Sequence, residues 1–147
     1  MAVMEQAEIQ ALLPHRYPFL LVDRVLELEP DRRIVGIKNV TANAPFFQRH
    51  FAGRPVMPGV LILEAMAQVG GLLAFKSLGP TSKPVVYLTG LDGAKFRKPV
   101  VPGDRLRFEI DVLKKRSPFW KMAGKAYVET ELVCEAEVTA MVTEEKA

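Results

Sequence analysis

One segment constrains the fold of this chain more than any other. From Val60 to Phe75 it reads VLILEAMAQVGGLLAF, in which Glu64 and Gln68 are the only polar side chains. Pro58-Gly59 precedes the segment and Gly79-Pro80 follows it, which are start and stop signals for a helix. A helix that is apolar on every side is buried, and about sixteen residues are fewer than the roughly twenty that cross a bilayer. We therefore expect this helix in the middle of the fold, with other elements wrapped around it.

Those other elements are predicted to be strands. Arg105–Val112 alternates apolar and charged residues with a period of two, which predicts a strand with one solvated face. Comparable patterns predict five more strands: Phe19–Leu28, Ile34–Thr41, Val85–Leu91, Phe119–Val128 and Leu132–Val142. Glu29–Arg32, between the first two, has the composition of a turn. Because consecutive strands without intervening helices pair antiparallel, the prediction is an α+β fold: a curled antiparallel sheet of roughly five to seven strands around one long helix.

Two glycines inside the predicted helix suggest close contacts. Gly70 and Gly71 each cost about 1 kcal/mol relative to alanine in a helix interior, so another element is expected to press on the helix there. That element is either the sheet or a second copy of the molecule. One small sheet covers only one side of an apolar helix, which makes a homodimer the expected assembly.

Length and composition limit the class of protein. The 147 residues suit one domain, so residues 1–147 are expected to form a single unit. With 49% hydrophobic residues, 25% charged residues and one cysteine, neither a disordered chain nor a disulfide scaffold is expected. The first twenty residues lack the features of a signal peptide, and no apolar run reaches about 18 residues. These observations favour a soluble, cytoplasmic protein that is not bound to a membrane.

The charges are unevenly distributed, although the net charge is only +3. Between Lys95 and Lys125 there are ten basic and three acidic residues, whereas Ala126–Ala147 contains six glutamates and one lysine. One interpretation is a set of solvated strand faces whose charges pair across the sheet. The other is a docking surface for an acidic partner. No nucleic-acid-binding motif accompanies the basic residues, so nucleic acid is not an expected partner.

Three residues around the start of the predicted helix could carry chemistry. A carboxylate on a buried apolar helix is costly, so Glu64 is expected to have a partner, to stay protonated or to reach solvent through a cleft. Gly59 leaves backbone N–H groups free at the helix start, where an oxyanion can approach without meeting a Cβ atom. Just upstream is His50, and histidine is the residue type that titrates nearest neutral pH, although a single histidine is more often structural than catalytic.

Together these groups suit the removal of water from a 3-hydroxyacyl compound. His50 would take the proton next to the carbonyl, the N–H of Gly59 would stabilise charge on the carbonyl oxygen, and Glu64 would protonate the leaving hydroxyl. The apolar helix could line a tunnel long enough for the hydrocarbon chain of a lipid. The product would be an enoyl compound.

Other chemistries fit the sequence less well. It has no glycine-rich phosphate loop and no Gly-x-Ser-x-Gly motif, which argues against nucleotide binding and serine hydrolysis. Two histidines and one cysteine without a His-Glu-x-x-His pattern make a metal site improbable. Cys134 falls on the inward face of a predicted strand and is expected in the core.

Three stretches closely resemble one family. Residues 50–68, HFAGRPVMPGVLILEAMAQ, resemble the signature segment of the bacterial Z-type 3-hydroxyacyl-acyl-carrier-protein dehydratases, which have the hotdog fold. PHRYPFLLVDRV at 14–25 and KFRKPVVPGDRL at 95–106 match the same family. The resemblance covers nearly the whole chain, from about residue 11 to residue 142. It departs at Ala52, where family members commonly have proline, and this difference puts the aim of the His50 loop in question.

The resemblance implies roles for particular residues. His50 and Glu64 look like the catalytic pair, contributed by different subunits of a dimer, and dimers in this family often form trimers of dimers. The substrate is a (3R)-3-hydroxyacyl chain on acyl carrier protein, and no cofactor or metal is implied. Glu64, in place of the aspartate of the related A-type enzymes, favours dehydration without isomerisation. The implied substrate-binding residues are Gly59, Phe51, Val60 and Gln68, and the implied carrier-binding residues are Arg97, Lys98, Lys114, Lys115 and Arg116.

Two alternatives remain within the same fold. An acyl thioesterase would use the carboxylate with water and would leave His50 without a role. A non-catalytic acyl-binding regulator would need an output module, for which 147 residues leave no room.

Overall fold

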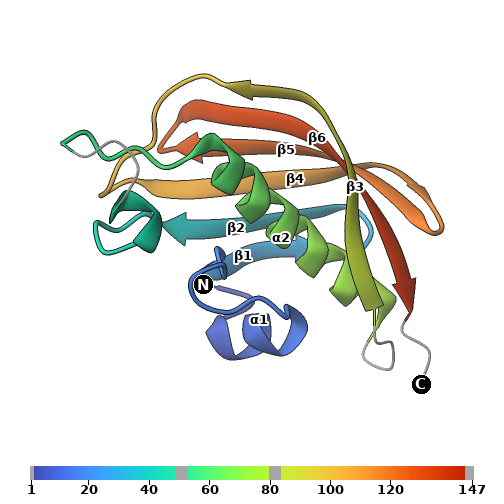
Figure 1. Cartoon of the computed structure of the whole chain (residues 1–147). Coiled ribbons are helices and arrows are strands. Elements are labelled where there is room, and N and C mark those ends of the chain that lie inside the picture. The colour runs from blue at the N-terminus through green and yellow to red at the C-terminus, as the bar shows by residue number, and fades with distance from the viewer. Residues whose placement is uncertain (1, 49–52, 80–83, 145–147) are drawn as a thin grey trace.

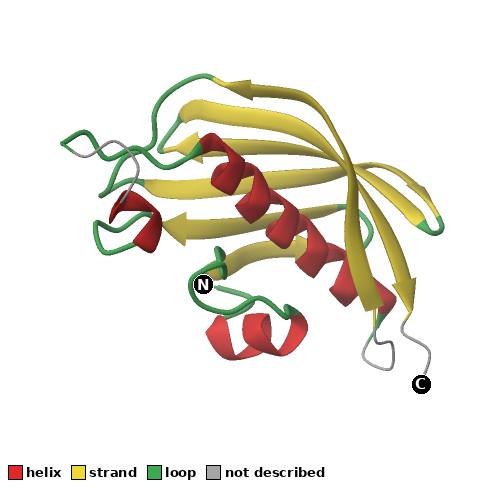
Figure 2. Cartoon of the chain, viewed as in Figure 1, coloured by secondary structure: helices red, strands yellow, loops and turns green. Residues whose placement is uncertain are grey.

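The described chain forms one antiparallel sheet with a long helix lying across its inner face (Figures 1 and 2). The computed structural model describes residues 2–48, 53–79 and 84–144. Its helices are α1 (Gln6–Leu12), the 3-10 turn η1 (Pro45–Gln48) and α2 (Gly59–Leu78). Its strands are β1 (Arg24–Glu29), β2 (Arg33–Asn39), β3 (Pro84–Phe96), β4 (Arg105–Arg116), β5 (Phe119–Val128) and β6 (Glu131–Glu144).

The strands lie in the order β1-β2-β4-β5-β6-β3, and every neighbouring pair is antiparallel. The predicted antiparallel sheet around one long helix is therefore confirmed. β1 and β2 are joined through the expected turn, in which Asp31 adopts a positive φ of 65°. β2 pairs with β4, although α2 and β3 lie between them in the sequence. This pairing joins β1 and β2 to the rest of the sheet.

β4 runs four residues past its predicted end, to Arg116, and the predicted strands at the two edges of the sheet differ from the observed ones more. The predicted strand from Phe19 begins only at Arg24, because the Leu21 N–H donates to the side chain of Gln68 on α2 instead of to another strand. β3 runs on to Phe96, well past the predicted end, and pairs with β6 through two register shifts. Both differences at the edges arise where a contact with a residue distant in the sequence sets the end of the strand, and the local sequence pattern does not reveal such contacts.

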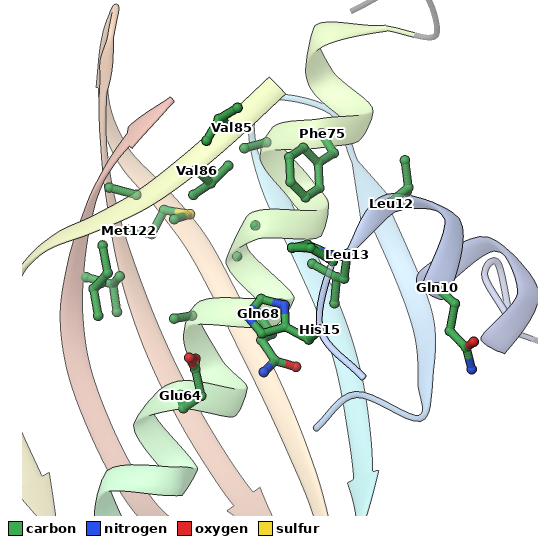
Figure 3. Close-up of a pocket in the computed structure, with 18 of the residues that line it drawn as sticks. Gln10, Leu12, Leu13, His15, Glu64, Gln68, Phe75, Val85, Val86 and Met122 are labelled. Carbon is green, nitrogen blue, oxygen red and sulfur yellow. The ribbon is translucent and has the colours of Figure 1, made fainter. Parts of the chain in front are cut away.

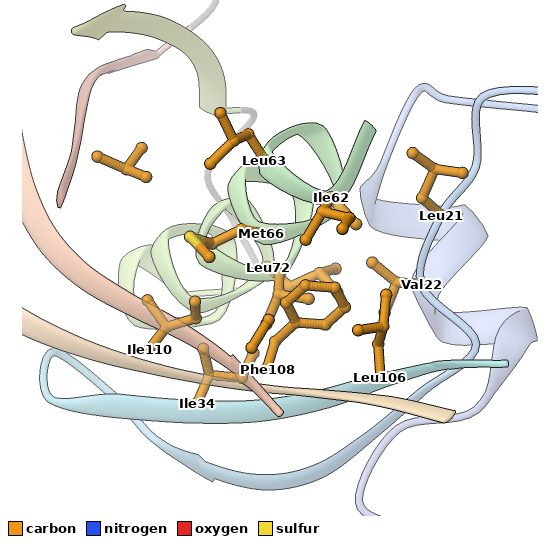
Figure 4. Close-up of a cluster of buried hydrophobic side chains, with 14 of the residues drawn as sticks. Leu21, Val22, Ile34, Ile62, Leu63, Met66, Leu72, Leu106, Phe108 and Ile110 are labelled. Carbon is orange, nitrogen blue, oxygen red and sulfur yellow. The ribbon is translucent and has the colours of Figure 1, made fainter. Parts of the chain in front are cut away.

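The core lies between α2 and the inner face of the sheet (Figure 4). Figure 4 shows side chains of α2 pointing toward those of β2 and β4, and fully burying each such side chain contributes roughly 1.5–3 kcal/mol. In the first half of β4 every second residue points inward and joins this core layer, as the alternating sequence pattern predicted. The central residues are Ile34, Ile62, Met66, Leu72, Leu106, Phe108 and Ile110.

The length of α2 corrects one expectation. The helix has 20 residues, not about sixteen, and by length and composition it could cross a bilayer. However, 67% of its most apolar window is buried inside the fold, as in the core helix of a soluble protein. Burial, and not length, therefore identifies α2 as a core element.

The sheet explains one of the two mid-helix glycines. A Cβ atom on Gly70 would lie 2.9 Å from Cε of Met122 on β5, so the sheet occupies the space that a side chain would need. A Cβ atom on Gly71 would meet only Leu13, at an ordinary 3.9 Å. The close approach predicted for the helix is thus confirmed at Gly70, and the sheet is the element that makes it.

Candidate active site

Glu64 lies in the second turn of α2, where it lines a cavity. Its side chain is half-buried, and no hydrogen bond or ion pair joins it to another residue in the described ranges. Among the described residues that line a cavity of about 580 Å³, it is the only carboxylate. A single acid at the wall of a cavity is placed to act on a bound molecule.

That cavity lies between α2, the loop after α1 and the strands β3, β5 and β6 (Figure 3). Figure 3 shows Glu64 at one end and Phe75 farther along α2, with Val85 and Val86 of β3 opposite. Most of the wall beyond Glu64 is apolar. The arrangement suits a ligand with a reactive group beside the carboxylate and a hydrocarbon chain along α2.

Gly59 and Val60 line a different hollow. This second cavity, of about 400 Å³, lies at the start of α2 beside Phe96, Arg97 and Lys98. Val60 is 70% exposed, and a Cβ atom on Gly59 would lie 2.5 Å from the ring of Phe96. Packing of that ring is therefore one reason for a glycine here. Contact of its N–H with a thioester carbonyl stays a prediction.

Gln68 uses its amide inside the protein. Its Oε1 accepts a hydrogen bond from the Leu21 N–H at 2.9 Å, and its Nε2 donates to the Phe19 carbonyl at 2.7 Å. These two bonds hold the chain before β1 against α2. The side chain is 2% exposed, yet it also lines the larger cavity beside Glu64. Substrate contact by Gln68 stays a prediction, whereas its structural role is evident from its partners.

Two predicted site residues and the unusual alanine fall outside the described residues. These are His50, Phe51 and Ala52, within the segment 49–52. The predicted pairing of His50 with Glu64 accordingly stays a prediction.

The five predicted carrier-binding residues form two groups that the fold separates. Arg97 and Lys98 follow β3 near the start of α2, where Arg97 pairs with Glu135 at 2.9 Å and Lys98 pairs with Glu131. Lys114, Lys115 and Arg116 lie at the far end of β4, next to the turn before β2.

The far group is the less neutralised of the two. Lys115 pairs with Asp31 at 2.6 Å and lies 4.7 Å from the ring centroid of Trp120. Lys114 faces Lys121 across the β4–β5 pair. The predicted pairing of basic and acidic side chains across strands is therefore confirmed for several residues of the basic region. At the turn between β4 and β5, basic side chains remain in excess.

Other titratable groups add little to the site. Cys134 is in the core as expected, where burial, with a smaller contribution from Glu135, raises the pKa of its thiol to about 11. Among the residues that the structure describes, no three His, Cys, Asp or Glu side chains are placed to bind a metal ion.

Three polar residues that line the larger cavity, Gln10, His15 and Arg16, were not singled out from the sequence. His15 follows α1 and faces the same space as Glu64. It belongs to the stretch PHRYPFLLVDRV, so the family resemblance was the one signal that could have drawn attention to it.

Solved structures share the fold at low sequence identity. A dehydratase heterocomplex, ApeI:P from Xenorhabdus doucetiae, matches with a TM-score of 0.78 and 17% identity, over 92% of this chain and 90% of that one. A hypothetical thioesterase with coenzyme A from Streptococcus pneumoniae matches with a TM-score of 0.64 and 18% identity, over 84% and 87%. At such identities these likenesses establish the hotdog fold alone.

Sequence comparison identifies the family. Residues 13–137 match the model of the FabA-like domain. The 3-hydroxyacyl-[acyl-carrier-protein] dehydratase FabZ of Geotalea uraniireducens is 56% identical over 96% of this chain and 98% of that protein. FabZ of Campylobacter concisus is 52% identical, over 97% and 99%. The chain therefore belongs to the FabA-like family, among its FabZ-type 3-hydroxyacyl-[acyl-carrier-protein] dehydratases.

Proposed function

We propose that this hydro-lyase dehydrates 3-hydroxyacyl-acyl-carrier protein with Glu64 as the acid and His50 as the base. His50 removes a proton from C2, the C3–O bond breaks as Glu64 protonates the hydroxyl, and a C2–C3 double bond and water form. The N–H of Gly59 stabilises the charge that develops on the thioester oxygen. The observation that carries the proposal is the position of Glu64, the only carboxylate among the described residues of the mostly apolar cavity.

The acyl carrier protein is proposed to dock beside Arg97 and Lys98. Both residues line the same hollow as Gly59, so a carrier bound there would deliver its thioester to the start of α2. Lys114, Lys115 and Arg116 lie at the other end of β4, away from Gly59. Within one subunit, the group next to Gly59 is therefore the better candidate.

A homodimer is proposed as the working unit, with dimers assembled in threes. β3 is an edge strand of 13 residues with exposed Tyr87, Leu88 and Leu91. An apolar open edge of this kind is a ready surface for a second copy of the chain. We further propose that residues 1–147 act as a single cytoplasmic hotdog domain, and that His50 reaches Glu64 of the other subunit.

The function is tested by incubating the protein with a 3-hydroxyacyl thioester and identifying the product. Wild type is expected to release the enoyl thioester, and His50→Ala and Glu64→Gln are each expected to lower turnover at least ~100-fold. Circular dichroism and the mass of the assembly control for folding. Free thiol and free acid as products would instead indicate a thioesterase. Wild-type turnover in either variant would remove that residue from the mechanism.

A further inference from the structure

Gly71 is the mid-helix glycine of α2 whose presence packing does not explain. Glycine is among the least favourable residues inside a helix. At Gly70 a Cβ atom would lie 2.9 Å from Cε of Met122, so the sheet occupies the space of a side chain. Among the described residues outside α2, a Cβ atom on Gly71 would approach only Leu13, at an ordinary 3.9 Å. Alanine would fit at position 71 and would favour the helix, so the glycine there has another reason.

The space beside Gly71 belongs to the larger cavity. Gly71 is one of the residues that line this cavity together with Glu64. Between Glu64 and Phe75, the lining residues Ala67, Gly71 and Ala74 offer only backbone and methyl groups to it. Positions 67, 71 and 74 are separated by four and three residues and therefore share one face of the helix. A side chain at position 71 would thus enter the cavity instead of the packed core.

Gly71 lies well beyond the reactive end of the cavity. It follows Glu64 by seven positions, which is about 10 Å along the helix axis. Figure 3 shows Glu64 at one end of the cavity and Phe75, four residues past Gly71, toward the other. An extended alkyl chain advances about 1.3 Å per carbon, slightly less than one C–C bond length. A chain whose C3 lies beside Glu64 would therefore pass Gly71 about eight carbons farther on.

We propose that Gly71 sets the length of acyl chain that this enzyme accepts, because its missing side chain leaves space for the distal carbons. This inference rests on the proposed role of Glu64, which places C3 of the substrate beside the carboxylate. A side chain at position 71 would occupy volume that distal methylenes otherwise fill. Each methylene that moves from water to an apolar wall raises affinity about fourfold, so long chains would lose affinity and short chains would not.

A second copy of the chain does not explain this glycine. Gly71 is buried within one subunit, and the atom nearest to its missing Cβ belongs to Leu13 of the same chain, which is itself buried. Exposed apolar side chains such as Tyr87 and Leu91 lie instead on β3, where a second copy has access. The glycine therefore serves the interior of the subunit.

The test measures kcat/KM for two substrates that differ only in length, the 3-hydroxybutyryl and 3-hydroxymyristoyl thioesters of acyl carrier protein. The short chain ends before Gly71, whereas the long one reaches past it. For the long substrate, we expect Gly71→Ala to lower kcat/KM about fourfold and Gly71→Leu at least about 20-fold, because they displace one methylene and several methylenes. For the short substrate, both variants should stay within about twofold of wild type.

Two controls separate an effect on the acyl chain from an effect on folding. Gly71→Ala is expected to raise Tm by about 3 °C, since alanine favours the helix interior and meets no clash. This variant alone decides the test if Gly71→Leu does not fold. Lys76→Leu, at an exposed position of α2 that does not line the cavity, should change kcat/KM for either substrate less than about twofold.

Equal losses for both substrates, or an unchanged value for the long one, would overturn the proposal. A lower Tm for Gly71→Ala would show that packing requires the glycine and would also overturn it. So would a changed assembly mass in that variant, which would assign the glycine to a subunit interface. Failure of the proposed function would appear separately, as absence of enoyl product from the wild type with either substrate.

Discussion

Gln68 illustrates how much one side chain can organise. It is the only buried polar side chain among those that the structure describes. Its amide joins α2 to residues 47 and 49 positions away in the chain, and so fixes the segment that leads into β1. Because that segment follows the loop bearing His15, a packing contact at Gln68 also shapes the cavity wall.

Replacing Gln68 with leucine tests this organising role. The Leu21 N–H and the Phe19 carbonyl would lose their partners, which is expected to lower the free energy of unfolding by about 2–4 kcal/mol. Urea denaturation measures the change. Gln10→Leu is the matched control, since the side chain of Gln10 makes only an exposed bond to Gln6 and its loss is expected to cost less than about 0.5 kcal/mol. Equal stability of the two variants would contradict the role.

At the scale of elements, sequence reasoning succeeded where periodicity was strong. β5 has the predicted bounds, and β4 begins where alternation begins. β3 was predicted too short because its apolar run ends at Leu91, whereas its length is set by pairing with β6. The cost of burying a carboxylate singled out Glu64, which the structure places at a cavity wall, and its role as the acid stays a prediction. The buried, unpaired Nδ1 nitrogen of His15 is visible only in three dimensions.

The basic residues also show what sequence reasoning cannot predict. Arg97 and Lys114 are close in sequence, but between them β4 runs from Arg105 to Lys114, about 30 Å at roughly 3.3 Å per residue. Residues that are close in the sequence therefore need not lie on the same surface of the protein. Only the fold separates the two groups.

The separation allows the two groups to be tested against each other. Arg97→Ala with Lys98→Ala is expected to raise KM for the carrier-bound substrate about threefold, because these side chains lie beside Gly59. KM for a small thioester should not change. Lys114→Ala with Arg116→Ala is expected to leave both values near wild type. Steady-state kinetics at low salt measure the effect, and the opposite order would place the carrier at the far end of the sheet.

For the whole molecule, the sheet order matters most. One edge strand, β1, is partly covered by a bridge between Met4 and Val25, whereas β3 at the other edge presents a long apolar margin. Together with the open face of α2, this margin gives the chain a surface that a second copy could cover.

Lysine substitutions along the exposed apolar edge of β3 should dissociate the proposed dimer. Tyr87→Lys with Leu91→Lys is expected to shift the particle from an oligomer toward the monomer mass, since lysines on an open edge oppose strand pairing. Sedimentation velocity measures the mass. Val3→Lys with Val101→Lys, at exposed apolar positions off β3, is the control. An unchanged mass in the β3 variant would show that this edge is not the interface.

The order of elements along the chain has a consequence for synthesis. α2 leaves the ribosome before four of the six strands that cover it. Until β3 to β6 are made, its apolar surface has only β1 and β2 as shelter, and a nascent chain in this condition is prone to aggregate or to engage chaperones. Completion of the C-terminal half is therefore what makes this protein able to fold, and a premature stop after α2 should yield an insoluble product.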